Sequence, residues 1–295
     1  MVPKVYVILL NWNGWSDTLE CLSSLQRLNY PNCRVIVVDN GSTDDSASRI
    51  REQFPMIELI ETGRNLGFAA GCNVGIARSL AEAADYVWLL NNDTTVEPDA
   101  LQRLIDKAMS GSRIGAVGSA IYTAHSPEQL DAWGGGCVNF WLGGSRHFVR
   151  PVCDEKIRFI TGASLLLPRT VIQTLGALDE GFFMYWEDAA YCFHLRAKGF
   201  RLAVAGESKV WHKGSASVGR GSATMDFYFN ASAARFFNQY SPVPLLSTWV
   251  GVLLRIAKRL IAGDWNRARA VWGGARAQGS RTNPCQPVII PHTNK

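Results

Sequence analysis

Short apolar runs alternate with helical patterns through the first hundred residues. The runs are typical of strands and lie at residues 5–10, 34–38, 56–61 and 86–90. Periodic apolar positions predict helices between them, from about residue 16, after residue 45 and over 68–81. This alternation predicts parallel strands with helices on both faces of the sheet. No GxGxxG follows the first strand, which argues against a dinucleotide-binding fold.

After about residue 115 the pattern becomes less regular. Further strands are predicted at residues 114–122, 158–167, 201–206 and 209–212, with a helix over 187–200. Residues 123–157 are rich in glycine and aromatic side chains and show no clear period. We expect an α/β domain over residues 1–224, with a mixed, mainly parallel central sheet flanked by helices. Its two halves are residues 1–120 and 121–224.

The remaining residues, 225–295, predict a basic helical extension. On a helical wheel, residues 245–261 divide into two arcs. One arc carries Leu245, Leu246, Trp249, Val252, Leu253, Ile256, Leu260 and Ile261, and the other carries Ser247, Gly251, Arg255, Lys258 and Arg259. Such an amphipathic helix either packs on its own domain or lies in the surface of a membrane that contains anionic lipid.

Composition and charge refine this picture. With 47% hydrophobic and 19% charged residues, the chain is globular and can bury a sizeable core. From Arg235 onward there are nine Lys or Arg and one acid, so the excess positive charge belongs to the tail. The seven cysteines are scattered and never spaced as CxxC, which favours free thiols in a reducing compartment.

The apolar runs are too short for a signal peptide or a membrane-spanning helix. We therefore expect a cytoplasmic protein, peripheral on the cytoplasmic membrane through the amphipathic helix, without a nucleic-acid partner.

The first candidate for chemistry is the stretch VIVVDNGSTDDS. A strand ends in Asp39, and Asn40 and Ser42 follow in a turn rich in backbone donors. Ligands of open α/β sheets bind beyond the carboxyl ends of strands, where Asp39 can accept the ring N–H of a pyrimidine base. A turn or cap is the alternative for Asp39, and capping is favoured for Asp44 and Asp45.

The second candidate is the stretch YVWLLNNDTTVEPD, in which Asp93 follows Asn91 and Asn92 at a strand end. Asp93 is either a turn residue or a metal ligand. Further along, KVWHKGSAS places His212 after a short apolar strand. A lone histidine is more often structural, although manganese tolerates imidazole as a ligand. The other histidines are read as structural: His125, His147, His194 and His292.

The third candidate is the pair Glu187–Asp188, which follows an aromatic run ending in Trp186 at a helix start. Acidic residues at a helix N-terminus are stabilised by the helix dipole, which accounts for one of the two. The second carboxylate, beside aromatic faces that can bind sugar rings, suggests a general base acting on a hydroxyl group.

Together these stretches resemble the family 2 glycosyltransferases of GT-A fold, most closely the rhamnosyltransferase-like members. The matching stretches are VILLNWNG, VIVVDNGSTDDS, NLGFAAGCNVGI, WLLNNDTTVEPDAL, TGASLLLPR, GFFMYWEDAAYC and WHKGSAS, over about residues 1–217. The resemblance implies inverting transfer of a sugar, with rhamnose from a dTDP or UDP donor as the best guess. The acceptor would be a saccharide or a lipid-linked saccharide in bacterial surface polysaccharide synthesis.

The same resemblance implies a role for each matching residue. Asp39 would hold the base, and the nucleotide pocket would be lined by Asn11, Asn40, Ser42, Asn73 and Asn92. Asp93 and His212 would hold a Mn²⁺ or Mg²⁺ ion on the diphosphate. Asp188 would be the general base and Glu187 would orient acceptor or sugar. The acceptor site would be bordered by Gly162, Ala163 and Trp186.

Two residues depart from the family pattern. Asn91 occupies the first position of the DxD element, so a weaker metal site is expected, with ligands supplied by the donor diphosphate. Ala190 stands where an acid often follows the Glu-Asp pair, which puts more weight on Asp188. The alternatives are a nucleotide- or polysaccharide-binding protein of the same fold without turnover, and a sugar nucleotidyltransferase. The latter would need a cationic loop after the first strand, and residues 11–15 contain no cation.

Overall fold

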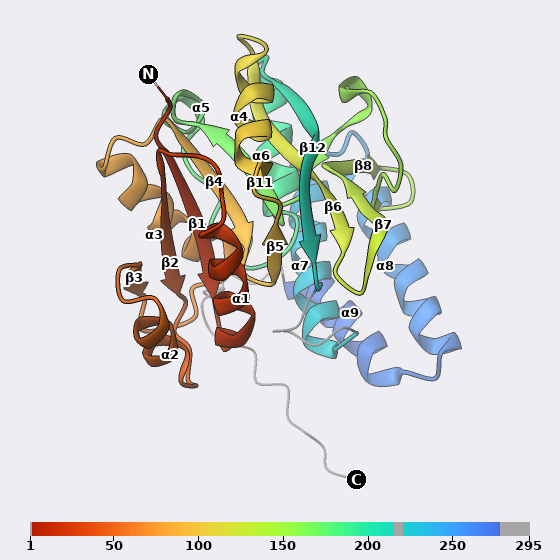
Figure 1. Ribbon diagram of the computed structural model, residues 1–295. Coiled ribbons are helices and arrows are strands. Elements are labelled where there is room, and N and C mark those ends of the chain that lie inside the picture. The colour runs from red at the N-terminus through yellow and green to blue at the C-terminus, as the bar shows by residue number, and fades with distance from the viewer. Residues whose placement is uncertain (1, 215–220, 278–295) are drawn as a thin grey trace.

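The computed structural model describes residues 2–214 and 221–277 (Figure 1). The end of the WHKGSAS stretch, Cys285, His292 and the tail after Ala277 lie outside the described residues. Within the described part, a nine-stranded sheet lies between layers of helices and a three-stranded sheet lies beside it. The cysteines of this part are free thiols, as predicted. None of its helices is both long and apolar enough to cross a membrane.

The first half of the large sheet consists of parallel strands in the order β3-β2-β1-β4. The strands are β1 (Val5–Asn11), β2 (Cys33–Asp39), β3 (Glu58–Glu61) and β4 (Tyr86–Asn91). The helices of this half are α1 (Trp15–Leu25), α2 (Ser46–Gln53), α3 (Phe68–Ala81) and α4 (Ala100–Met109). Alternate side chains of β1 point into two hydrophobic cores, one on each face of the sheet. Val7 belongs to the core that contains α1, α2 and α4, and Ile8 belongs to the core that contains α3.

The second half of the large sheet makes it mixed. Past β4 the order continues β11-β6-β12-β5, with β11 antiparallel to β4 and β6, and with β12 parallel to β6. These strands are β5 (Thr94–Val96), β6 (Ile114–Thr123), β11 (Ser164–Pro168) and β12 (Arg201–His212); β7 (Ser126–Trp133) pairs with β6. Helices α5 (Arg169–Leu175) and α6 (Glu187–Ala197) contribute to the core on the α3 side. The predicted mixed, mainly parallel sheet flanked by helices is confirmed.

The aperiodic segment contributes a separate antiparallel sheet in the order β10-β8-β9. Its strands are β8 (Gly135–Asn139), β9 (Gly144–His147) and β10 (Phe159–Ile160), with a short 3₁₀ helix at Asp154–Lys156. A Cβ on Gly135 would lie only 1.8 Å from the carbonyl oxygen of Phe159. Close backbone approach of this kind requires glycine, so these strands lack the apolar alternation by which strands are predicted.

Three helices form the C-terminal region: α7 (Ala223–Tyr240), α8 (Pro244–Ile261) and α9 (Trp265–Ala277). The helical extension is as predicted, but α7 contributes Ala233, Phe236 and Phe237 to the core shared with α3, α5 and α6. The boundary placed between residues 224 and 225 therefore falls inside a helix of the main core. Helices α8 and α9 (blue in Figure 1) lie on the side of the molecule away from α2 and β3.

Candidate active site

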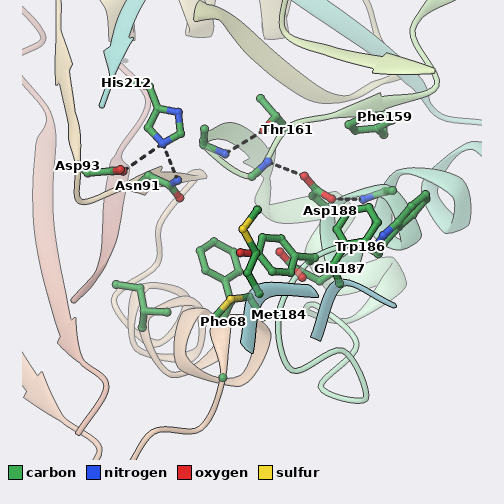
Figure 2. A pocket seen from close by; sticks show the side chains of 18 of the residues that line it. Phe68, Asn91, Asp93, Phe159, Thr161, Met184, Trp186, Glu187, Asp188 and His212 are labelled. Atoms are coloured by element: carbon green, nitrogen blue, oxygen red, sulfur yellow. Dashed lines mark hydrogen bonds and ion pairs between the residues drawn. The ribbon is translucent and has the colours of Figure 1, made fainter. Parts of the chain in front are cut away.

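A cavity of about 510 Å³ lies beyond the carboxyl ends of β1 and β4, between α6, α7 and β9 (Figure 2). Most of the predicted site residues line it: Asn40, Asn92, Asp93, Gly162, Ala163, Trp186, Glu187, Asp188 and His212. The carboxyl edge of an open α/β sheet is the expected place for a ligand. The structure thus brings residues from four predicted motifs to one space.

Asp93 and His212 are brought together by strand pairing. Strand β5 follows β4 after a tight turn and pairs antiparallel with the end of β12, which sets His212 opposite Thr94. The His212 Nε2 atom lies 3.1 Å from Asp93 Oδ1 and 3.2 Å from Asn91 Nδ2 (Figure 2). An oxygen and a nitrogen ligand candidate therefore share one corner of the cavity, although neither stretch alone distinguishes a ligand from a structural residue.

This corner offers few protein ligands to a metal ion. Among residues 2–214 and 221–277, no group of three or more His, Cys, Asp or Glu side chains is placed to hold one. Asp93, His212 and Asn91 offer one carboxylate, one imidazole and one amide. Such a set suits Mn²⁺ or Mg²⁺ when substrate phosphates and water complete the coordination. An ion held by these three residues would bind together with a diphosphate, and this metal site stays a prediction.

Helix α6 begins after a strained turn. Tyr185 and Trp186 both have a φ of 68°, in the left-handed region that residues other than glycine rarely adopt. Each such residue costs about 1–3 kcal/mol and persists where its surroundings fix it, typically at functional sites. Here the Trp186 ring lies 4.8 and 5.1 Å from the rings of Phe236 and Phe237. Trp186 borders the cavity, but most of its surface is buried in the core.

Asp188 is held by backbone donors. Its Oδ2 accepts a hydrogen bond of 2.8 Å from the N–H of Gly162, and its Oδ1 accepts one of 2.6 Å from the N–H of Ala189 (Figure 2). Burial raises the pKa of Asp188 above its ordinary value, while these donors and the charge of His147 partly offset the rise. A fixed carboxylate with a raised pKa at a cavity wall is suited to general base catalysis.

Glu187 has a different environment from its neighbour. It is buried, and its Oε2 has no hydrogen-bond partner among the described residues. Desolvation, followed by the charge of Asp188, raises the pKa of Glu187 well above its ordinary value. Because only Asp188 has backbone donors on both oxygens, we infer that a proton shared by the pair resides on Glu187. Asp188 is then the charged member.

This inference predicts the pH dependence of a Glu187→Gln variant. A carboxyl whose pKa is raised by folding destabilises the folded protein progressively as pH rises above the unfolded value of about 4.5. Glutamine removes that effect. The variant's free energy of unfolding, relative to wild type, should therefore increase between pH 5 and pH 8 in urea titrations. Glu128→Gln, at an exposed position of β7, is the control; an equal response of both variants would contradict the inference.

Asn11, Asp39 and Ser42 form a network behind the cavity wall. The Asn11 Nδ2 donates to Asp39 Oδ2 at 2.7 Å, and the Ser42 N–H donates to Asp39 Oδ1 at 2.9 Å. Asp39 is 3% exposed. The turn-stabilising alternative for Asp39 is therefore realised, and its contact with a nucleobase, like those of Asn11 and Ser42 with the nucleotide, stays a prediction.

Asn73 lies outside this cavity, and its predicted nucleotide contact stays a prediction. Its amide nitrogen donates to the Leu178 carbonyl and to Glu180 Oε1, both at 2.9 Å, and its oxygen accepts from the Leu178 N–H at 3.0 Å. Asn73 does not line the cavity and instead fastens the loop before α6 to α3. Asn40 does line it, and its oxygen accepts from the Leu66 N–H at 3.0 Å.

Two elements contribute cavity residues that sequence reasoning missed. Arg146 and His147 come from β9, and Met225 and Phe229 come from α7. The sequence predicts a structural role for His147, yet its charge acts on Asp188 and its ring lies 5.7 Å from that of Phe159. The sequence does show a basic pair, Arg146–His147, within the glycine-rich stretch. Because the hairpin that carries this pair is not predicted, the pair could not be assigned to the site.

Known proteins with similar sequences are glycosyltransferases. The model of the family described as "Glycosyl transferase family 2" matches residues 6–176. A relative from Mycobacterium tuberculosis, named N-acetylglucosaminyl-diphospho-decaprenol L-rhamnosyltransferase, is 28% identical over 248 residues, covering 76% of this chain and 80% of its own. The Shigella flexneri dTDP-rhamnosyl transferase RfbF is 21% identical over 215 residues, covering 72% and 70%.

Solved structures give the same fold. The mannosyltransferase PcManGT from Pyrobaculum calidifontis, in complex with GDP-Man and Mn²⁺, aligns with a TM-score of 0.61 and 18% identity over 95% of this chain and 82% of its own. GalNAc-T7 with UDP, GalNAc and Mn²⁺ aligns with a TM-score of 0.67 and 14% identity, over 91% and 54%. At these identities the likeness concerns the fold alone.

Proposed function

The chain belongs to glycosyl transferase family 2, and from that premise we propose that it moves a sugar from a nucleoside-diphosphate donor to an acceptor hydroxyl with inversion at the anomeric carbon. One observation carries the proposal. The backbone-held carboxylate of Asp188 faces the same cavity as the Asp93–His212 pair (Figure 2). A base for the acceptor and a site for the leaving diphosphate are the two requirements of this reaction.

In the proposed step the acceptor oxygen attacks the anomeric carbon as the bond from that carbon to the diphosphate oxygen breaks. Asp188 accepts the hydroxyl proton, and the diphosphate leaves with the bonding electrons. Base catalysis of this kind typically supplies about 10²–10⁴-fold. Protonated Glu187 can donate a hydrogen bond to sugar or acceptor, a role that its unpartnered Oε2 supports.

Asp93, His212 and the amide of Asn91 would hold a divalent ion, Mn²⁺ or Mg²⁺. When bound, such an ion stabilises negative charge on the diphosphate. Arg146 also lines the cavity, so this chain supplies a cationic side chain of its own to the same space.

The donor sugar is proposed to be rhamnose, carried by dTDP or UDP. The support is the printed names of the two rhamnosyltransferase relatives. One of these names also includes a diphospho-decaprenol acceptor, so we assign this chain an acceptor carried on a polyprenyl lipid. An enzyme that uses such an acceptor in surface polysaccharide synthesis would work at the cytoplasmic face of the membrane.

A second candidate is a nucleotide-binding protein of the same fold without turnover. It is favoured by Asn91, which leaves Asp93 as the one carboxylate of the DxD element, and by the absence of a three-ligand group among the described residues. The two candidates differ in whether bound donor is consumed.

Thermal shift against UDP-, dTDP- and GDP-sugars, with and without Mn²⁺, tests the proposal. We expect the largest rise in melting temperature with dTDP-rhamnose and Mn²⁺, since a ligand at a hundred times its Kd stabilises by about 2.7 kcal/mol. Slow hydrolysis of the same donor would identify the enzyme and exclude the second candidate. No shift with any nucleotide sugar would contradict both.

A further inference from the structure

Helix α8 packs on the domain through its polar arc. Arg255 Nη1 donates to the Gly143 carbonyl at 2.7 Å, and Arg259 pairs with Asp226 of α7 at 2.8 Å. Ser247 is fully buried in the same contact. An amphipathic helix on a globular domain normally buries its apolar arc, so this orientation is the reverse of the usual one.

Most of the apolar arc of α8 consequently faces outward, whereas Val252 is fully buried and the partly buried Ile256 packs with it against Val271 and Ala275 of α9. Leu245, Leu253 and Ile261 are 73%, 59% and 89% exposed. We call this arc, together with the adjoining Leu254, the apolar face; its exposed members are Leu245, Leu246, Trp249, Leu253, Leu254, Leu260 and Ile261. No charged side chain interrupts it. Contiguous exposed apolar surface of this kind marks a binding surface for protein or membrane.

A second element, which packs on α8, also exposes apolar side chains. The turn between β8 and β9 exposes Trp141 and Leu142, at 66% and 55%. The same turn packs directly on α8, because a Cβ on Gly143 would lie 1.8 Å from the Ser247 carbonyl oxygen. The turn is therefore fixed to the helix that carries the apolar face.

Helix α9 adds an aromatic and basic border. The Trp272 ring lies 5.5 Å from that of Trp249, which links α9 to the apolar face. Three basic side chains of the two helices are exposed: Lys258 of α8, and Arg269 and Arg276 of α9. Within the described part of the chain, Lys258 and Arg269 form no ion pair. Residues 244–277 contain a single acid, Asp264.

We infer that the apolar face, Trp141, Leu142 and Trp272 together form a docking surface for a lipid bilayer that contains anionic lipid. Tryptophan is enriched where protein meets the interface of a bilayer, and unpaired lysine and arginine are attracted to anionic headgroups. The charge favours a membrane as the occupant, because an apolar helix face bordered by exposed basic side chains, with one acid in residues 244–277, is typical of a helix that lies on anionic lipid. The inference rests on the proposed lipid-linked acceptor, and it identifies the surface that meets the membrane.

The docking surface is connected to the cavity by two short elements. Strand β9 follows the Trp141–Leu142 turn and ends at His147 in the cavity wall, and its four residues span about 10 Å. Helix α7 contributes Phe229 to the wall and Asp226 to the α8 contact. Docking through this surface would hold the cavity close to the headgroup layer, where a lipid-linked saccharide can enter it.

Sedimentation with vesicles tests the inference. Wild type should bind vesicles of equal parts phosphatidylglycerol and phosphatidylcholine, and bind pure phosphatidylcholine vesicles more weakly. Leu245→Glu/Leu253→Glu and Trp141→Glu should each weaken binding by about tenfold or more, since burial of one leucine side chain is worth about that factor. Both sites are exposed, so the fold should persist. Met56→Glu is the matched control, because Met56 is 95% exposed and lies between α2 and β3, on the other side of the molecule (Figure 1).

Three results would overturn the inference: wild type that does not bind either vesicle, substituted proteins that bind as well as wild type, or a stable wild-type dimer that Leu253→Glu converts to a monomer. The nucleotide-induced thermal shift is measured on the same proteins. Lost vesicle binding with an unchanged shift leaves the proposed transfer function standing. A missing shift with intact vesicle binding affects the function alone.

Discussion

Replacing Asp188 by asparagine should lower kcat by about a hundredfold or more while leaving donor affinity unchanged. The substitution keeps the size of the side chain and an acceptor for the Gly162 N–H, but it removes the group that takes the acceptor proton. Steady-state transfer assays would give kcat, and isothermal titration with the nucleotide would give the affinity.

Asp45→Asn provides a matched control for this variant. Asp45 is exposed at the start of α2, outside the cavity, so the same chemical change should leave turnover as it is. Near-normal transfer by Asp188→Asn would show that another group serves as the base. Loss of both turnover and donor affinity would instead indicate that the substitution disturbs the Gly162 loop.

Replacing Asp93 by alanine should remove the part of nucleotide affinity that depends on Mn²⁺. Contacts to a charged group are worth about 1.5–3 kcal/mol, so we expect an affinity loss of about tenfold or more with Mn²⁺. Affinity without the ion should change little. Titration of the nucleoside diphosphate at both conditions measures the two quantities.

His212→Ala should reproduce this pattern, because His212 Nε2 lies 3.1 Å from Asp93 Oδ1. Residues that serve one site are not additive, so the double variant should lose little more than either single one. Asp99→Ala, at the exposed N-terminus of α4, is the control. Equal nucleotide affinity of wild type and Asp93→Ala with Mn²⁺ would refute the ligand role.

The parts of the fold that could be predicted are those in which local pattern and tertiary structure agree. Strands β1, β2 and β4 are buried, carry continuous apolar runs and end in Asn11, Asp39 and Asn91. Their parallel pairing places those ends at one edge, so candidate residues could be assigned to a common site before any distance was known.

The parts that escaped prediction depend on contacts between distant segments. The β8–β9 hairpin is built on glycines required by close backbone approach, and His147 entered the site with it. The left-handed pair Tyr185–Trp186 is fixed by rings of α7, about 50 residues later. The wheel of α8 separates apolar from polar positions, but which positions are buried depends on contacts with Asp226, the Gly143 turn and α9, which a wheel does not contain.

The anomeric configuration of the product tests the central claim most directly, because direct displacement assisted by Asp188 inverts the reacting carbon. The donor that the thermal-shift screen identifies would be incubated with wild type and acceptor. The carbon–proton coupling at the anomeric carbon of the new linkage would then be measured by nuclear magnetic resonance. The product should have the configuration opposite to that of the donor. A retained configuration would contradict the claim, since a single displacement from the side opposite the diphosphate always inverts the reacting carbon.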